Sequence, residues 1–593
     1  MYIFDFFSKK KNHSAATGRF ATYQEIADNF YNCPPLKEKI SVLKILTGIF
    51  FLIFFIISLS SFFYLQERLT SDIAVQFNIF SAIISVIFLI AILFLFLPYF
   101  FNKKNIKKAG FRNFFKLGML SKTIIGIDRN KRFEHCMIIS PTGGGKTSKY
   151  IIPGIKNDAS YSNTSVFAID IDSPYLYTNV KHEWLKRGKT AINFDPYFEN
   201  TAHFNPLVNK YNEIISNEKL YELSSALFHP DADNIKTGDM HAYRYYARRA
   251  SDVFYACLLY LKYKYGVKYF NLSTVFRFLK KGAKFIEKEV SSYNGLNDKL
   301  IKEGFNNLFE LPVYERAKVI TDIINELSFL RNETTSNAFK TSDKKDSNFT
   351  LGDIFERDTL LIAGIPKEKL GAGGAKMMSF LTDMVIKEIY EHRRKRLKNA
   401  DAALDAAGNN NNDNNNKITG NYVKDKDING NLYDAGIKND LYNEASVKED
   451  TDIYLYLDEF PALTLNNFDV ELANLRKTKT GVLITVQDIS FLEEKYGNAS
   501  LIDSNIGTHI IMGHASNDTC ETYSKKMGNK YVLHKEKMNT ANHEGIFPGN
   551  VTMHETPVSS GLYPLMNPDE IKNMDTDKVL IFTKFTNPFI LNI

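Results

Sequence analysis

The chain has 593 residues, 44% of them apolar, which is ample for several packed domains and excludes a chain that is disordered throughout. Its 74 Lys and Arg residues against 67 Asp and Glu give a formal charge of +7, a mild excess that permits a polyanionic partner without proving one. The four cysteines are far apart and form no C-x-x-C pair, so neither a zinc site nor a disulfide framework is predicted.

Two long uncharged runs, 45–65 and 73–101, stand near the N-terminus, and each is long enough to cross a hydrocarbon core, which takes about 20 helical residues. Lysines and arginines lie before the first run and after the second. Because positively charged flanks stay in the cytoplasm, the pattern predicts a transmembrane hairpin that follows a short cytoplasmic segment, 1–44, with the bulk of the chain also cytoplasmic. Buried core helices of a soluble domain are the alternative, although neither run has a polar face.

A glycine-rich turn follows the apolar run Cys136–Ile139 and precedes a predicted helix, and it reads S-P-T-G-G-G-K-T over Ser140–Thr147. In such turns the glycines let backbone N–H groups face one anion, the lysine reaches the β and γ phosphates, and the following hydroxyl can ligate Mg²⁺. We therefore predict that ATP and Mg²⁺ bind here, with the nucleotide held by Thr142, Gly143, Gly144, Gly145, Lys146 and Thr147.

Ser140 stands where the usual pattern G-x-x-x-x-G-K-[ST] has its first glycine, so the strict pattern is not satisfied. The residues that contact phosphate in the pattern, Gly143 to Thr147, are intact. A glycine-rich surface turn that carries a lysine by chance is the alternative.

Short apolar runs that end in polar residues recur after the turn, separated by lengths typical of helices, and they predict a mainly parallel sheet buried on both faces in an α/β fold. Active groups in such sheets gather at the carboxyl ends of the strands. The runs are Val166–Ile169, Ala191–Phe194, Leu360–Ile362, Ile453–Leu457, Val482–Val486, His509–Met512 and Val579–Phe582.

Between about 210 and 346 the apolar spacing becomes helical, as in Tyr246–Tyr265 and Ala317–Leu330. We predict an all-α domain inserted into the sheet domain, which would then comprise 102–209 and 347–593. The alternative is that these are the flanking helices of the sheet itself, although more than 130 residues without a clear strand is long for one crossover.

The stretch 399–450 is of low complexity and contains an Asn-rich run, so we expect a surface excursion without regular structure. Just before it, Lys387–Lys398 forms a basic helix end. This end could contact a phosphate backbone or could simply be a solvated helix terminus, and the residues alone favour neither.

The run Ile453–Leu457 delivers Asp458 and Glu459 to a strand end. With the glycine-rich turn upstream, Asp458 is predicted to hold Mg²⁺ through water and Glu459 to polarise the water that attacks the γ-phosphate. Gln487 follows the next strand and is suited to sense the γ-phosphate or to orient that water. Arg476 precedes this strand and could reach the nucleotide of a neighbouring subunit or be a surface charge.

Together these motifs resemble the type IV coupling proteins, the VirD4/TraG-like membrane ATPases of conjugation and type IV secretion. The resemblance covers almost the whole chain. It rests on the two N-terminal spans, Pro141–Thr147, Phe194–Pro196 with Asn205 and Pro206, Leu457–Phe460, Gln487 with Phe491–Gly497, and Leu565–Glu570. One departure is Asp170–Pro174, which stands where many relatives read D-x-K-G-E.

The resemblance implies a RecA-like P-loop NTPase domain with an inserted all-α domain and a two-helix anchor, assembled as a homo-hexamer at the bacterial inner membrane. Such proteins receive a relaxase attached to single-stranded DNA, or protein effectors, and deliver them to the type IV secretion channel with the use of ATP. The resemblance also places Arg476 where the family has an arginine that reaches the neighbouring subunit's nucleotide. Two alternatives remain open: an ATP-ordered docking receptor without motor activity, and a segregation-type DNA translocase.

Overall fold

The computed structural model describes residues 19–33, 114–120, 123–228, 240–344, 347–409, 424–426, 432–434, 451–465, 467–497, 499–540 and 552–593. The predicted membrane runs, 45–65 and 73–101, lie outside these residues. Within the described ranges, no helix is both long and apolar enough for a membrane span. The described residues form two compact units, one within Thr22–Arg129 and Leu591–Ile593 and the other within Met1–Ala21 and Asn130–Ile590.

The smaller unit is a short antiparallel sheet with one helix. Its elements are α2 (Tyr23–Asn29), β1 (Tyr31–Cys33), β2 (Phe114–Leu120) and β3 (Thr123–Asp128), with the strands in the order β1-β3-β2. Asn592, the residue before the C-terminal one, pairs with Met119 of β2. This sheet was not predicted from the sequence. β2 and β3 form a hairpin with two residues between them, whereas β1 comes from a distant part of the chain.

The larger unit is built on a mainly parallel sheet, which confirms the predicted α/β fold, and every predicted apolar run lies in one of its strands. β15 is antiparallel to β12, while the neighbouring pairs from β12 to β6 are parallel. The strand order is β15 (Lys578–Thr583), β12 (Thr508–Met512), β4 (Cys136–Ile139), β11 (Thr480–Val486), β10 (Asp452–Leu457), β5 (Thr164–Asp170), β7 (Thr359–Gly364) and β6 (Thr190–Phe194).

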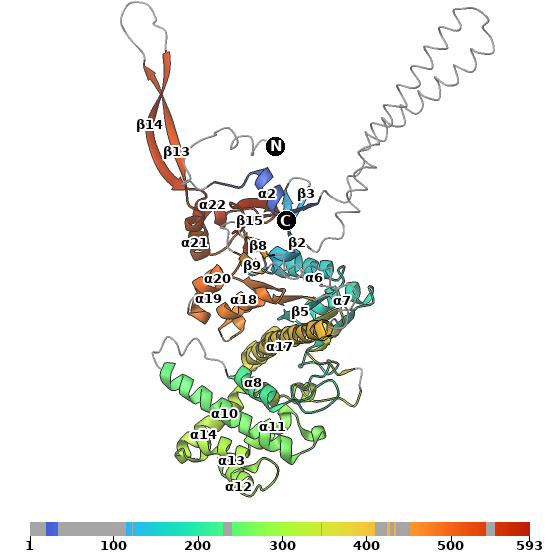
Figure 1. Ribbon diagram of the computed structural model, residues 1–593. Helices are drawn as coiled ribbons and strands as arrows, with labels where there is room; N and C mark the ends of the chain where they lie inside the picture. Colours follow the sequence, from blue (N-terminus) through green and yellow to red (C-terminus); the bar gives the residue numbers. More distant parts are fainter. Residues whose placement is uncertain are drawn as a thin grey trace, which may run out of the picture. The chain divides into compact units, whose positions relative to one another are not determined.

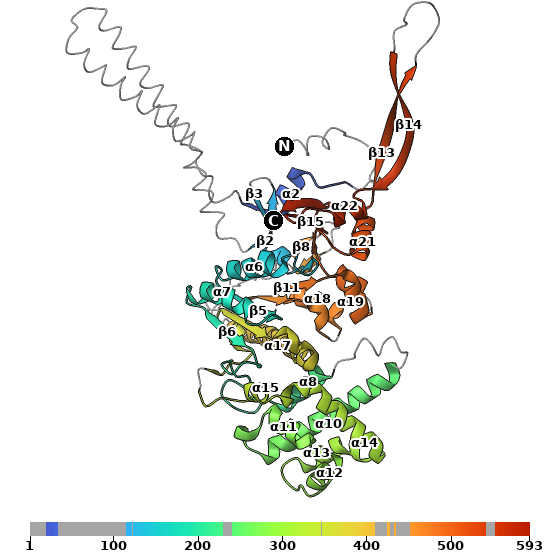
Figure 2. The same cartoon turned by 180° about the vertical axis from the view of Figure 1, so that it is seen from behind.

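Helices cover both faces of this sheet. The chain moves along the strand order in one direction from β4 to β5 and β6, and in the opposite direction from β10 to β11 and β12. Because crossovers between parallel strands are right-handed, the helices of the two paths lie on opposite faces. The first path contains α6 (Ile152–Asp158) and α7 (Tyr175–Leu185), and the second contains α18 (Phe468–Lys477), α19 (Ile489–Tyr496) and α20 (Ala499–Ser504) (Figure 1, Figure 2).

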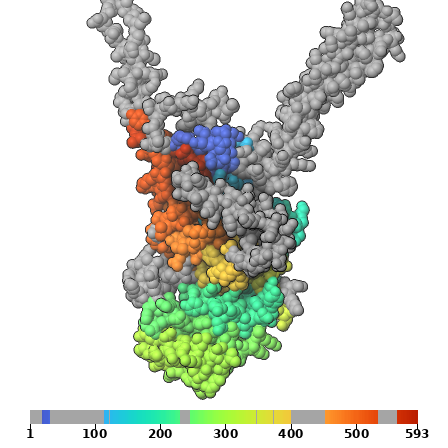
Figure 3. Space-filling model, in the orientation of Figure 1, coloured from blue at the N-terminus to red at the C-terminus, as the bar shows by residue number. Residues whose placement is uncertain are grey.

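The chain between β6 and β7 is helical, as its periodicity predicts, and no β-strand longer than an isolated bridge occurs there among the described residues. The helices form one continuous body, drawn in green in Figure 3. Phe254 and Phe305 are fully buried at its centre. The elements are α8 (Asn217–Leu227), α10 (Met240–Lys264), α11 (Leu272–Leu279), α12 (Ala283–Ser291), α13 (Asp298–Phe309), α14 (Val313–Glu326) and α15 (Glu333–Ala338).

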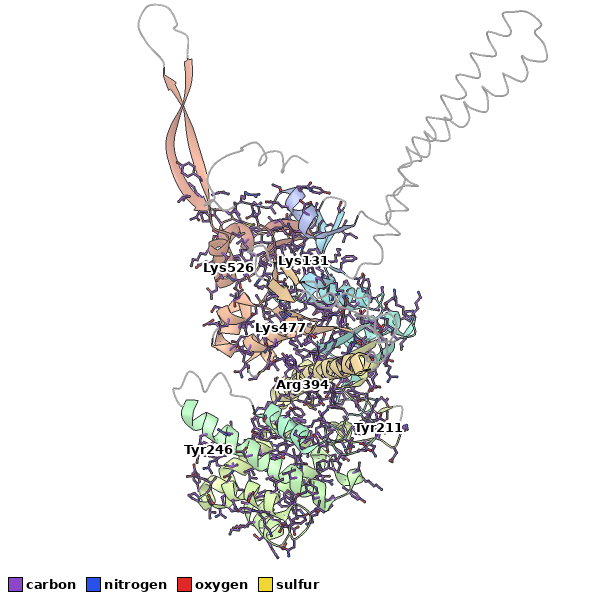
Figure 4. The ribbon with its side chains drawn as sticks, in the orientation of Figure 1. Lys131, Tyr211, Tyr246, Arg394, Lys477 and Lys526 are labelled. Carbon is purple, nitrogen blue, oxygen red and sulfur yellow. The ribbon has the colours of Figure 1, made fainter. Side chains whose placement is uncertain are left out.

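Helix α17 (Gly374–Asn409) connects the helical body to the sheet. Lys387 Nζ donates to the carbonyl of Glu222 in α8 at 3.0 Å. Arg393 is buried, and its guanidinium donates to the carbonyls of Thr478 and Thr451 at 2.9 and 2.7 Å. These two members of the predicted basic helix end therefore have structural roles, whereas Arg394, labelled in Figure 4, is exposed.

The predicted excursion 399–450 contains more regular structure than expected. Helix α17 continues to Asn409, and β8 (Lys424–Lys426) pairs with β9 (Leu432–Asp434) as an antiparallel ribbon. The expectation is wrong for these residues. The helix continues because 400–407 is rich in alanine, which has the highest intrinsic helix propensity. The Asn-rich run 410–416 lies outside the described residues.

The C-terminal part contains α21 (Asn517–Met527), a long antiparallel ribbon of β13 (Asn529–Thr540) and β14 (Thr552–Pro564), and α22 (Pro568–Lys572). The motif Leu565–Glu570 forms the start of α22. The backbone N–H of Asn567 donates to Glu570 Oε2 at 2.7 Å, and Pro568 occupies the first helical position, where no N–H is needed. This motif therefore has a local structural explanation.

Candidate nucleotide site

The glycine-rich turn begins directly after the central strand β4. The backbone N–H of Ser140 donates to the carbonyl of Val486 in β11 at 3.1 Å, so the start of the turn is fixed to the neighbouring strand. Gly143 and Gly145 have φ angles of 79° and 95°. These angles lie in the left-handed region that favours glycine, so both glycines are needed for the turn that a phosphate cradle requires.

Ser140, the departure from the usual pattern, is accommodated by Gly144. Ser140 is fully buried, and a Cβ atom at position 144 would lie 2.1 Å from Ser140 Oγ and 3.2 Å from the carbonyl oxygen of Pro141. A side chain at 144 therefore requires the Ser140 hydroxyl to rotate away and the backbone at Pro141 to shift.

Gly144→Ala is expected to weaken nucleotide binding about tenfold or more. A displaced loop loses hydrogen bonds to charged phosphates, each of which contributes ~1.5–3 kcal/mol. Calorimetric titration with an ATP analogue measures the loss. The double variant Ser140→Gly/Gly144→Ala should recover part of the affinity, because it removes the hydroxyl that the new methyl group meets. Equal affinities for the single and double variants would contradict this account.

The helix after the turn starts with a wide, π-helical segment, Thr147–Ile151, in which the N–H of Ile152 bonds to the carbonyl of Thr147. Pro153 follows, and because proline has no N–H it cannot continue the ordinary ladder at this point. The N-terminal end of this helical stretch faces the turn and adds the positive end of its dipole to the cradle.

Lys146 and Glu459 form an ion pair in the site, with Nζ 3.1 Å from Oε1. Lys146 Nζ also donates to the carbonyl of Ser140 at 3.2 Å, and the lysine is buried. Glu459 stands two residues after the end of β10 with φ 47° and ψ 49°, a left-handed conformation that is uncommon for a residue other than glycine. The predicted phosphate-binding lysine and the predicted catalytic carboxylate are therefore neighbours.

Asp458 receives a hydroxyl donor on each carboxylate oxygen. Thr147 Oγ1 donates to Oδ2 at 2.8 Å, and Thr485 Oγ1 of β11 donates to Oδ1 at 2.5 Å. Burial raises the pKa of Asp458 above its usual value, and the two hydroxyl donors oppose that rise. The oxygens of Thr147 and Asp458 are the ligand type that Mg²⁺ prefers, so the residues fit this ion.

Gln487 completes the cluster at the end of β11. Its Nε2 donates to Glu459 Oε2 at 3.0 Å, and its Oε1 accepts from Thr142 Oγ1 at 3.1 Å. The amide therefore connects the predicted catalytic carboxylate to the glycine-rich turn.

The sheet topology explains why these residues meet. β11 lies between β4 and β10, all three strands are parallel, and the site residues follow their carboxyl ends. The structure thus brings together Thr142, Lys146, Thr147, Asp458, Glu459 and Gln487, although more than 300 residues separate the two halves of the site. Their roles in nucleotide chemistry stay predictions.

Arg476 lies apart from this cluster. It lies in the last turn of α18, its side chain is 55% exposed, and its Nη2 pairs with Glu134 Oε1 at 3.0 Å. Among the described residues it makes no hydrogen bond or ion pair with the other predicted site residues. Lys477, the next residue, is labelled in Figure 4.

Two sets of residues in or near the site were not predicted from the sequence. Thr485 is one, because a threonine inside an apolar strand carries no chemical signal of its own. The other is a buried network behind the site, in which Arg132 pairs with Asp158 of α6 at 2.6 Å and both contact the hydroxyl of Tyr456 in β10. Neither could be found without knowing which strands and helices are neighbours.

A glycine-rich loop after a central parallel strand, with a carboxylate pair on a strand nearby, defines the P-loop class of nucleotide-binding folds. A family model for conjugative DNA transfer by the type IV secretory system matches residues 101–405, just over half of the chain. A second model, the TraM recognition site of TraD and TraG, matches residues 452–576. The chain therefore belongs to the TraG/VirD4-like coupling proteins of conjugative DNA transfer.

One solved structure has a similar fold, and others give lower scores. The bacterial conjugative coupling protein TrwBdeltaN70, in its unbound form, gives a TM-score of 0.50 at 14% identity and covers 81% of this chain and 88% of its own. TrwB with ADP and Mg²⁺ gives 0.46 at 13% identity, covering 80% and 89%. VirB4 of Thermoanaerobacter pseudethanolicus gives 0.31 at 12% identity, covering 70% and 87%. No curated protein sequence matches the chain.

Proposed function

We propose that this coupling protein is an ATP hydrolase that uses Mg²⁺ and couples hydrolysis to the movement of DNA toward a type IV secretion channel. The observation that carries the proposal is the meeting of Lys146, Thr147, Asp458, Glu459 and Gln487 at adjacent strand ends. Such a cluster combines a cation for phosphates, oxygen ligands for a metal ion and a carboxylate for a water molecule.

Each residue has a defined task in this proposal. The backbone N–H groups of Gly143 to Thr147 and the ammonium group of Lys146 bind the phosphates of ATP. Thr147 and Asp458 hold Mg²⁺, which when bound neutralises charge on the β and γ phosphates. Glu459 accepts a proton from the attacking water, and Gln487 orients that water or senses the γ-phosphate. For this to occur, Lys146 must exchange its contact with Glu459 for a contact with phosphate, which releases the carboxylate.

The finer assignments belong to the same proposal and follow from family membership. The chain would be anchored in the bacterial inner membrane by the runs 45–65 and 73–101. It would act as a homo-hexamer that receives single-stranded DNA with its relaxase, or protein effectors, and contacts the channel components.

ATP hydrolysis by the purified full-length chain, measured with and without single-stranded DNA, tests the proposal. We expect Mg²⁺-dependent hydrolysis that single-stranded DNA accelerates and that EDTA abolishes. Hydrolysis that DNA does not change, together with cargo-protein binding by the helical body, would favour the docking receptor instead. Absence of hydrolysis under all conditions would refute the proposal that the chain is an ATP-driven motor.

Arg476→Ala is expected to abolish hydrolysis by the assembly while leaving nucleotide affinity unchanged, because its guanidinium would act on the nucleotide of a neighbouring subunit. Mixing experiments distinguish this role from a surface charge. Addition of Arg476→Ala to wild-type protein should lower the rate more steeply than dilution alone. Lys477→Ala is the matched control and should leave the rate unchanged. A strictly proportional fall in the mixtures would contradict the role in trans.

A further inference from the structure

Thr485 is buried at the centre of the candidate site, and its single hydroxyl serves both acidic residues. The hydroxyl donates its proton to Asp458 Oδ1 at 2.5 Å and accepts the backbone N–H of Glu459 at 2.9 Å. A threonine hydroxyl has one proton to donate and lone pairs to accept, so both capacities are in use.

The first contact sets the direction of the Asp458 carboxylate. The other carboxylate oxygen accepts from Thr147 Oγ1, but Thr147 is itself a predicted ligand of Mg²⁺. The Thr485 hydroxyl is not a predicted metal ligand, so its contribution to the site is to hold the Asp458 carboxylate and the backbone of Glu459. Because β11 lies beside β10 in parallel register, the side chain of Thr485 in β11 reaches Asp458 directly from the neighbouring strand.

The second contact stabilises the backbone of Glu459, whose left-handed conformation is unfavourable for a residue with a side chain. The N–H of Glu459 also donates to Asp458 Oδ1 at 3.1 Å, so the three groups close a small ring of hydrogen bonds. Loss of the hydroxyl would remove one donor to the carboxylate and one acceptor of the strained N–H at the same time.

We propose that Thr485 is the positioning residue of this site: its hydroxyl orients Asp458 for Mg²⁺ and holds Glu459 in place. The inference rests on the proposed function, because the metal ion is the one that accompanies ATP. Groups that orient a metal ligand typically change metal affinity about 10–100-fold when they are removed. Thr485→Val is the direct test, since valine has nearly the same shape and no hydroxyl.

The readout is binding rather than turnover. A fluorescent ADP analogue is titrated into the full-length chain with Mg²⁺ and, separately, with EDTA, and the ratio of the two affinities gives the enhancement by Mg²⁺. Thr485→Val should lower this enhancement about tenfold or more and leave the metal-free affinity unchanged. Thr485→Ser, which keeps the hydroxyl, should restore the enhancement, and Thr485→Ala should behave as valine does.

Thr508→Val is the matched control. Thr508 is also buried on a strand of the same sheet, and its hydroxyl finds no hydrogen-bond partner in the described part of the chain. This variant should retain the full enhancement. Two results would overturn the inference and leave the proposed function standing. In one, Thr485→Val and Thr485→Ala both keep the wild-type enhancement by Mg²⁺. In the other, both variants lose as much affinity for the ADP analogue in EDTA as they lose in Mg²⁺. If the wild-type chain itself showed no enhancement by Mg²⁺, the proposed metal site would fall and the inference with it.

Discussion

Glu459→Gln is expected to lower ATP hydrolysis by about 10²–10⁴-fold, because a neutral amide cannot accept the proton of the attacking water. Glutamine has the same shape as glutamate and can still receive the hydrogen bond from Gln487, so the site should keep its form. Removal of the charge also frees Lys146 from its ion pair. We therefore expect ATP to bind at least as tightly as in the wild type. Single-turnover hydrolysis and equilibrium binding of ATP measure the two effects separately.

Lys146→Ala provides the comparison, since it should lose both binding and hydrolysis. Transfer of DNA in a mating assay should fail with both variants. Transfer at the wild-type level by Glu459→Gln would show that hydrolysis by this chain is dispensable, which would contradict the motor and favour a docking receptor.

Asp158→Ala is expected to destabilise the larger unit by about 3–5 kcal/mol, because it removes the carboxylate that neutralises the buried charge of Arg132. Both side chains are almost fully buried, and the pair is bidentate, with distances of 2.6 and 2.9 Å. Tyr456 Oη donates to Asp158 Oδ2 at 2.6 Å, so the hydroxyl on β10 would lose an acceptor as well. The network connects α6, which follows the glycine-rich turn, to the strand that carries Asp458.

The single tryptophan of the chain makes this measurement local. Trp184 of α7 is fully buried, and its Nε1 donates to the carbonyl of Ile155 in α6 at 3.1 Å, one turn before Asp158. Urea unfolding followed by Trp184 fluorescence should show a lower midpoint for Asp158→Ala. The exposed pair of Glu183 and Arg187 lies beside Trp184 in sequence, and Glu183→Gln should leave the midpoint unchanged. Equal midpoints for Asp158→Ala and wild type would contradict the account.

Much of the larger unit could be predicted because its signals are local. Each strand is a short apolar run, and Gly143 to Thr147 form a contiguous motif whose chemistry follows from residue type and spacing. The pairing of Asp458 with that motif could also be predicted, since both follow strands of a parallel sheet and such strands align their carboxyl ends.

The basic helix end shows where local reasoning stops. Arg393 and Arg394 are adjacent and chemically identical, yet Arg393 is buried against two carbonyls while Arg394 is exposed. Their difference depends on which face of α17 meets the sheet, and that face is chosen by packing against distant elements.

By itself the sequence determined most strands and helices of the larger unit and which residues can bind phosphate, because those properties depend on neighbours along the chain. Only the tertiary structure decided that Thr485 holds Asp458, that Arg132 and Asp158 share a buried network with Tyr456, and that Arg476 stands apart from the site of its own chain. The physical reason is that each of these relations depends on strand order and register, which join residues from 26 to more than 300 positions apart.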